Sequence, residues 1–272
     1  MPSWLTPPYR IALGAAIGCV FLIPMAVSLG GGEASAQSSP RPLPVLRQEI
    51  DRIDGEILKL LGERTAVVAE VGATKTVAGG PVFRPGRQAS LIRVLIARSG
   101  GAPTPQAIAS IWTNIIAASI RTQKPDFSVL VTQGTGTAGF GVAKDFFGAA
   151  IPVSVSPDAT SAFAALAEGH ADAVALPPAG EWWRAVPQGL AIVASAPLLR
   201  DALAPDLLIL ARQATDVSGA DMVLAVLPEG ATPGTVLARG AGEMLVAFGP
   251  DVPVPAVARE LGRVALPIPP GK

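Results

Sequence analysis

The fold of this chain is decided by residues 46–75, which read LRQEIDRIDGEILKLLGERTAVVAEVGATK. The apolar residues of this stretch recur every three or four positions, at Leu46, Ile50, Ile53, Ile57, Leu60, Leu61, Val67, Val68 and Val71. This period is typical of an amphipathic α-helix. We predict one long helix that ends near Gly79-Gly80-Pro81, about 50 Å from its start, and that needs partners along its length.

Two cations share the apolar face of this predicted helix. Arg64 occupies a position where the stripe requires an apolar side chain, and Lys75 projects only about 20° away around the helix axis. An unpaired buried charge costs several kcal/mol. The nearby acids of the helix, Asp54, Glu63 and Glu70, project in other directions. We therefore expect a bound anion to be the partner. Arg47 points about 100° away from Arg64, so it would have to serve a site of another copy of the chain.

Two shorter helices are predicted after the long one, over residues 87–98 and 105–123. Pro105 is typical of a first helical position. The apolar face of the third helix continues, one turn at a time, to Ser119 and Gln123, whose side chains project side by side. These polar groups either join the two cations in one site or lie at a fraying helix end. Their coincidence with the cations favours the site.

Composition limits the chemistry that this chain can perform. Its 272 residues include one cysteine and one histidine, which excludes a disulfide framework and argues against metal and Ser/His/Asp sites. Residues 45–124 hold eleven basic and six acidic residues, whereas residues 125–272 hold eight and fourteen. Residues 72–124 contain no acidic residue, a pattern that suits a small polyanion. We expect no nucleic acid partner, because the only aromatics there are Phe83 and Trp112 and no binding motif is recognisable.

The N-terminus has the pattern of an export signal. Residues 11–29 are almost wholly apolar and are followed by the small residues Ala34-Ser35-Ala36. We expect residues 1–36 to be a signal peptide that is cleaved after Ala36, which places the protein in the periplasm, and residues 37–44 to be a linker. The alternative is an uncleaved inner-membrane anchor over residues 11–29, since about 19 apolar residues suffice to span a membrane.

Five separated motifs keep a defined spacing across residues 45–124. They are Leu46-Arg47-x-x-Ile50-Asp51-x-Ile53-Asp54, Leu60-Leu61-x-Glu63-Arg64, Val71-x-x-x-Lys75, Phe83-x-Pro85-x-Arg87 and Ser119-x-x-x-Gln123. This pattern resembles the all-helical class of chorismate mutases. The resemblance implies an interlocked helical homodimer. It also implies an active site built from Arg64, Lys75, Arg87, Ser119 and Gln123 of one chain and Arg47 of the partner chain.

The resemblance implies a reaction, the rearrangement of the dicarboxylate chorismate to prephenate in aromatic amino acid biosynthesis. This rearrangement needs no proton transfer, so we expect neither a cofactor nor a metal. Arginines would grip the carboxylates, while Lys75 and Gln123 would donate hydrogen bonds to the ether oxygen as its negative charge grows. Gln88 stands where the family usually has a glutamate that holds the substrate hydroxyl. Arg84 replaces a common acidic residue and is a carboxylate anchor, a product-release gate or a surface arginine.

Residues 125–272 predict a small α/β domain. Strands are expected over 127–132, 151–155 and 173–176, helices over 141–147 and 159–168, a further strand over 221–227 and an extended end after Pro250. The stretch Gly134-Thr135-Gly136-Thr137-Ala138-Gly139 matches a dinucleotide-binding motif. A mutase fused to an NAD-dependent prephenate dehydrogenase is therefore one alternative, although only about 95 residues follow the third strand, which is short for a dehydrogenase domain.

The same module resembles the first lobe of a prephenate dehydratase over about residues 127–215. Its catalytic motifs are missing, because Pro177-Pro178-Ala179-Gly180 and Ala204-Pro205-Asp206 stand where dehydratases have Pro-x-Glu-Asn and Thr-Arg-Phe. We expect a degenerate domain in which Trp182-Trp183-Arg184 either walls an aromatic ligand or packs onto the sheet.

Together these patterns predict an α+β multidomain protein, with a three-helix mutase module followed by a small α/β domain. The expected function is chorismate mutase. The alternative is a non-catalytic ligand-binding or regulatory protein that keeps the mutase fold.

Overall fold

The structure is a computed structural model that describes residues 40–212, 216–230 and 232–271. By backbone contacts the chain divides into two units, residues 1–51 and residues 52–272. The predicted signal peptide or anchor lies outside the described residues, as does the first part of the predicted linker. Within the described residues, no helix combines the length and apolar character that a membrane span requires.

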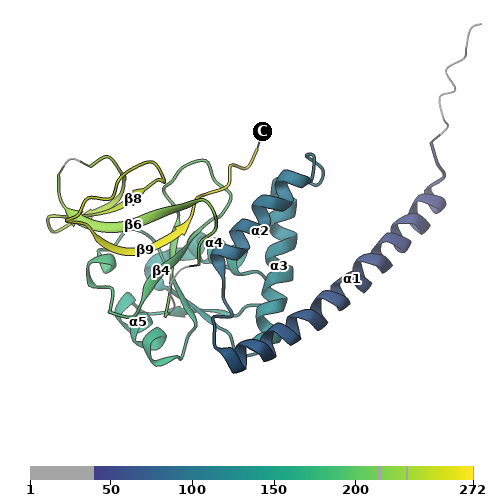
Figure 1. The fold of residues 1–272 in the computed structure, drawn as a ribbon, viewed down its shortest axis with the longest axis horizontal. Helices are drawn as coiled ribbons and strands as arrows, with labels where there is room; N and C mark the ends of the chain where they lie inside the picture. Colours follow the sequence, from purple (N-terminus) through teal and green to yellow (C-terminus); the bar gives the residue numbers. More distant parts are fainter. Residues whose placement is uncertain (1–39, 213–215, 231, 272) are drawn as a thin grey trace, which may run out of the picture. The chain divides into compact units, whose positions relative to one another are not determined.

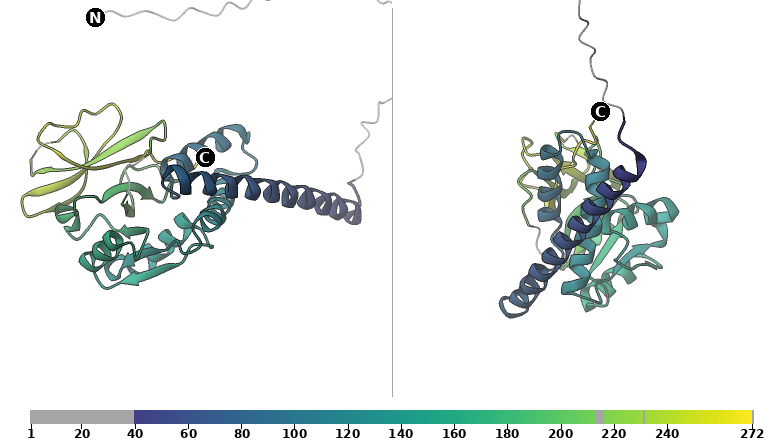
Figure 2. Two further views of the ribbon diagram at one scale, coloured as in Figure 1. Left: turned by 60° about the horizontal axis from the view of Figure 1, so that its bottom comes forward. Right: turned by 90° about the vertical axis from the view of Figure 1, so that its right-hand side faces the viewer.

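Three helices come first along the described chain (Figure 1). They are α1 (Leu43–Ala78), α2 (Pro85–Arg98) and α3 (Pro105–Gln123), and they confirm the three predicted helices. α3 begins with Pro105 and is capped by Thr104, whose Oγ1 accepts a hydrogen bond from the backbone N–H of Ala107 at 3.3 Å. α2 and α3 pack against each other, and α2 also contacts the strands β4 and β9 described below (Figures 1 and 2).

The first sheet has five strands in the order β2-β1-β3-β5-β4. Its parallel part consists of β1 (Val129–Thr132), β2 (Val153–Ser156) and β3 (Ala173–Leu176), connected through α4 (Gly136–Phe147) and α5 (Ala159–Glu168). Two antiparallel strands, β4 (Ala191–Ala196) and β5 (Leu207–Ala211), complete it. The parallel unit confirms the α/β arrangement predicted for this stretch.

A second, antiparallel sheet follows in the order β7-β8-β6-β9. Its strands are β6 (Asp221–Pro228), β7 (Thr235–Gly240), β8 (Glu243–Phe248) and β9 (Arg259–Ala265). Only β6 was predicted as a strand, while β9 lies in the stretch expected to be merely extended. β9 contains Gly262, where an added methyl group would overlap the carbonyl oxygen of Ile192 in β4. Glycine thus permits the two sheets to approach closely at this point.

The hydrophobic core crosses from the helices to the first sheet. Phe83, between α1 and α2, packs against Phe127 and Phe147, with ring centroids 5.9 and 5.5 Å apart. The same cluster contains Ala117 and Ile120 of α3 together with residues of β1, β3, β4 and β5. The predicted boundary between residues 124 and 125 therefore stays a prediction, because the packing does not separate the chain there.

Candidate active site

Side chains of α1 and α3 meet at the predicted site. Arg64 of α1 donates a hydrogen bond from Nη1 to Oγ of Ser119 in α3 at 2.5 Å. Ser119 in turn donates to the backbone carbonyl of Ile115 at 2.7 Å. Both residues are half-buried. Two residues that the sequence pattern joined across 55 positions are thus in direct contact.

Gln123 lies one turn after Ser119 and packs against α1. A methyl group added at Gly72 would lie 3.1 Å from Cγ of Gln123, so the small residue leaves room for this amide. Nε2 of Gln123 donates to the carbonyl of Ser119 at 3.1 Å, whereas its Oε1 is buried and has no hydrogen-bond partner among the described residues. An unpaired buried acceptor is uncommon in folded proteins, and a catalytic role is one of its recognised explanations.

Lys75 completes the α1 side of the site. Its ammonium group donates to the carbonyl of Pro81 at 2.8 Å, which ties the end of α1 to the connection before α2. In the described chain Lys75 has no ion pair with a carboxylate within 4.0 Å. Of the acids considered above, Glu63 pairs with Lys59 at 3.9 Å, one turn before it on the same helix. Among the described residues, neither Arg64 nor Lys75 forms an ion pair with an acid of α1, unlike Lys59.

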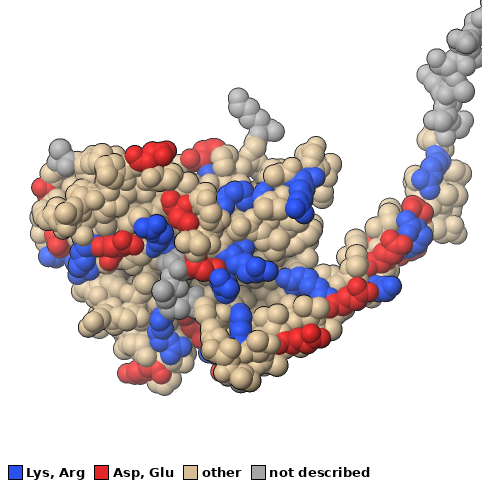
Figure 3. All heavy atoms as spheres, in the orientation of Figure 1, with Lys and Arg blue, Asp and Glu red and all other residues tan. Residues whose placement is uncertain are grey.

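The cations of this site raise one another's electrostatic energy. Burial lowers the pKa of Arg64, and the neighbouring Arg87 lowers it further. Burial also lowers the pKa of Lys75, with additional lowering by Arg84 and Arg87 and partial opposition from Asp216. We call Arg64, Lys75, Arg84 and Arg87 the cation cluster. Figure 3 shows Lys and Arg side chains close together near the middle of the face that it draws. A bound anion would relieve this repulsion.

Arg84 and Arg87 flank the start of α2 and differ in their partners. The guanidinium of Arg84 pairs with Asp216, with Nη2 and Nε at 3.1 and 3.2 Å from Oδ2. The Arg87 side chain is exposed and forms no ion pair within the described part of the chain. Arg87 is therefore available for an anion, whereas Arg84 already has one partner. The sequence did not indicate Asp216, which lies 132 residues after Arg84.

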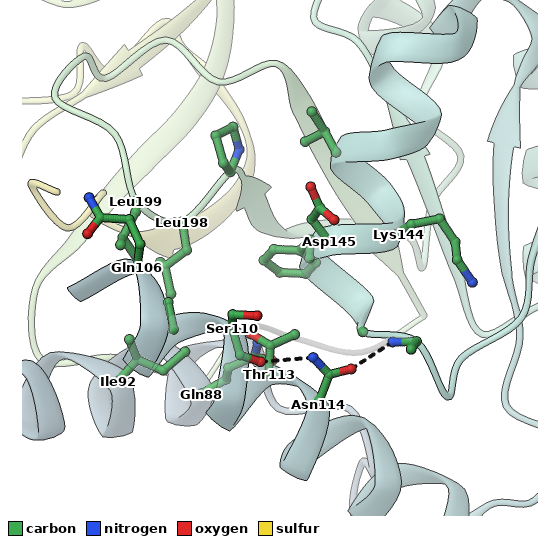
Figure 4. A pocket seen from close by; sticks show the side chains of 16 residues that line it. Gln88, Ile92, Gln106, Ser110, Thr113, Asn114, Lys144, Asp145, Leu198 and Leu199 are labelled. Carbon is green, nitrogen blue, oxygen red and sulfur yellow. Dashed lines mark hydrogen bonds between the residues drawn. The ribbon is translucent and has the colours of Figure 1, made fainter. Parts of the chain in front are cut away.

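Gln88 lies in a cavity of about 590 Å³ between α2, α3, α4 and residues 197–199 (Figure 4). Its side chain is only 7% exposed, and Nε2 donates to Oγ1 of Thr113 at 3.4 Å. Asn114 lines the same cavity and accepts a hydrogen bond from the backbone N–H of Ala149 at 3.0 Å. None of the cation cluster, Ser119 or Gln123 is among the residues that line this cavity. The Gln88 side chain thus lies in a cavity that these residues do not line, and its catalytic role stays a prediction.

The remaining predicted residues lie elsewhere. Arg47 is exposed on α1, and its role in a partner chain stays a prediction. Trp183 is 0% exposed and belongs to the hydrophobic core. It therefore packs in the protein interior, which is the second of the two alternatives given above for this side chain. Arg184 pairs with Glu181 and Glu243. The glycine motif spans a short turn at Gln133–Thr135 and the start of α4.

Comparison with known proteins places these observations in a family. Residues 46–124 match the sequence model described as chorismate mutase type II. This stretch is therefore a chorismate mutase type II domain, and an α/β region follows it. The match spans α2, α3, all but the first three residues of α1, and all eight predicted site residues.

Two curated relatives extend the comparison. The chain is 33% identical over 110 residues to a distant homologue from Aquifex aeolicus named bifunctional chorismate mutase/prephenate dehydratase, which covers 39% of this chain and 30% of that protein. It is 44% identical over 50 residues to the T-protein of Enterobacter agglomerans, which covers 18% of this chain and 13% of that protein. The chain thus matches less than a third of the length of either relative. No solved structure matches it.

Proposed function

We propose that this protein is a chorismate mutase that converts chorismate to prephenate. The observation that carries the proposal is the cation cluster, in which Arg64 and Lys75 are half-buried and Arg87 lacks an ion pair among the described residues. A dicarboxylate is the complementary ligand for several cations gathered in one place. The match of residues 46–124 to the chorismate mutase type II family supports the choice of this substrate.

The site residues can act without a cofactor because the rearrangement breaks a C–O bond and forms a C–C bond within one molecule. Arg64 and Arg87 would hold the two carboxylates and select a folded conformation. Lys75 would donate to the ether oxygen as negative charge develops there. Gln123 can assist, since an amide nitrogen has two N–H donors and the carbonyl of Ser119 occupies one. Donors fixed in advance lower the barrier by a few kcal/mol each.

A second chain would complete this site. The α1 residues Ile53, Ile57, Leu60, Val67 and Val71 are each at least 40% exposed, although the helix pattern places them on one apolar stripe. A helix of this length is stable in water mainly when such a stripe is covered. We propose that the partner's α1 covers it in a homodimer and supplies Arg47 to the site.

The direct test is the loss of chorismate absorbance on addition of the purified full chain. We expect turnover by the parent protein and by Arg98→Ala, a control that removes a cation at the end of α2 outside the site. Tight binding of chorismate without turnover would instead support the non-catalytic alternative. The absence of both chorismate binding and turnover would refute the proposed function.

Export to the periplasm remains part of the proposal. It rests on the sequence pattern of residues 1–36 alone. N-terminal sequencing of the protein from a periplasmic extract tests it, with Gln37 as the expected first residue. An intact N-terminus in the membrane fraction would support the anchor.

A further inference from the structure

We propose that Asp216 is a positioning residue of the mutase site, through which the α/β region holds the start of α2 and the substrate-binding Arg87. This inference rests on the proposed function and deepens it, because it makes the α/β region part of the active site's support. Asp216 lies in the connection between β5 and β6, outside the stretch that matches the family model.

The carboxylate of Asp216 caps the start of α2. Its Oδ2 accepts a hydrogen bond from the backbone N–H of Arg87 at 3.0 Å, and its Oδ1 accepts one from the N–H of Gly86 at 3.3 Å. α2 has no capping side chain of its own, because its N-cap position is Arg84. The first N–H groups of a helix need such acceptors, and their positive end favours a carboxylate. Asp216 therefore fixes the backbone from which Arg87 projects.

The same carboxylate forms an ion pair with one member of the cation cluster, Arg84. Oδ2 of Asp216 pairs with the Arg84 guanidinium, and the Asp216 side chain is only 15% exposed. It also partly opposes the lowering of the Lys75 pKa. Arg84 is thereby neutralised and held beside the region that follows the helices. Arg64, Lys75 and Arg87 remain as the cations that a dicarboxylate can bind.

Two features hold Asp216 in this place. A methyl group added at Gly86 would overlap the backbone carbonyl oxygen of Asp216. The start of α2 and the segment that holds Asp216 can therefore approach this closely only because residue 86 is glycine. Two residues after Asp216, Ser218 is buried, and its carbonyl accepts a hydrogen bond from Arg93 of α2 at 3.2 Å. The contact thus belongs to a packed interface between α2 and the α/β region.

Steady-state kinetics of four full-length variants test the proposal. Asp216→Ala removes the cap and the ion pair, whereas Asp216→Asn keeps one acceptor oxygen for the α2 N–H groups. Gly86→Ala blocks the approach of Asp216 without changing any charge. Asp251→Ala is the matched control, since it removes an exposed carboxylate of the α/β region in the connection between β8 and β9, away from the start of α2 in the sequence.

We expect Asp216→Ala to raise KM about tenfold with little change in kcat. The reason is that Arg87 would hold a carboxylate that keeps its charge in both ground and transition states. Gly86→Ala should resemble it, Asp216→Asn should fall between it and the parent, and Asp251→Ala should match the parent. In an Arg87→Lys background, Asp216→Ala should add little further increase in KM, because the two residues act through one contact.

Three results would overturn the inference. A fall in kcat with unchanged KM would indicate loss of folded enzyme, which is a merely structural role. A lower KM would mean that Asp216 competes with the substrate for the cations. If the increases in KM caused by Asp216→Ala and Arg87→Lys were fully additive in free energy, the two residues would act independently. An inactive parent protein would instead refute the proposed function, and the inference with it.

Discussion

At the residue scale, Arg64 and Lys75 are cations whose positions are unfavourable for the folded chain by itself. Each is half-buried beside other cations. Arg64 donates a hydrogen bond to the Ser119 hydroxyl and Lys75 donates one to the Pro81 carbonyl, so neither of these bonds goes to a carboxylate. We expect Arg64→Ala and Lys75→Ala each to lower turnover at least a hundredfold, about 2.7 kcal/mol. Thermal melts should show unchanged or higher melting temperatures, because each change removes a desolvated charge. Unfolding of both variants would show instead that the cations are structural.

The lowered pKa of Lys75 predicts how kcat/KM changes at alkaline pH. Its pKa is lowered from the ordinary value of 10.5, chiefly by burial, so kcat/KM should fall with a midpoint below 10.5 as the ammonium loses its proton. Because the unfolded chain binds this proton more tightly, stability should rise as pH increases from the folded pKa toward 10.5. Lys75→Arg should abolish the decline in kcat/KM, since arginine stays protonated. A decline that persists in this variant would assign it to another group.

The position of Gln88 leads to a separate expectation. Gln88→Glu would place a carboxylate in a buried setting beside Thr113, in a cavity that the cation cluster does not line. Burial raises the pKa of a carboxyl group, so the variant should lose stability as pH rises from 4 to 8, by about 1 to 3 kcal/mol. Turnover per folded molecule should change little. A large change in rate with a new pH response would show that Gln88 reaches the substrate.

At the element scale, the exposed stripe of α1 predicts self-association. Leu60 is 62% exposed and lies at its centre, so Leu60→Asp should weaken the proposed dimer and reduce turnover with it. Lys59→Asp is the matched control, because it introduces the same carboxylate one position along on the polar side. Sedimentation of both variants measures the effect. A monomeric parent, or a fully active monomeric Leu60→Asp, would contradict the shared site.

The elements also show how far the sequence alone could predict the structure. The period of apolar residues located α1, α2 and α3 to within about three residues, because the buried face of an amphipathic helix shows in its local sequence. Apart from β6, the strands of the second sheet escaped prediction for the opposite reason. β7 is an edge strand without a fully buried residue and β9 contains Gly262, so neither has a clear alternation. Their pairing depends on partners far along the chain, which periodicity does not reveal.

At the scale of the whole molecule, the helices and the α/β region form one packed body over residues 52–272. Phe83 belongs to a hydrophobic cluster that contains residues of both α3 and the first sheet, and Asp216 of the α/β region forms an ion pair with Arg84 at the start of α2. The candidate site was predictable where residues share a helix face, as in Arg64 with Lys75 or Ser119 with Gln123. It was not predictable for Asp216, whose only local sign was a helix that begins without a capping side chain.

The central claim is that the cation cluster binds chorismate in a site that a second chain completes. Mixing Arg47→Ala chains with Arg64→Ala chains tests it most directly. Each variant should be inactive by itself. After subunit exchange, turnover should recover to about a quarter of the parental level, since half of the random dimers are heterodimers and each of these has one intact site of two. No recovery after verified exchange, from an active parent, would contradict the claim.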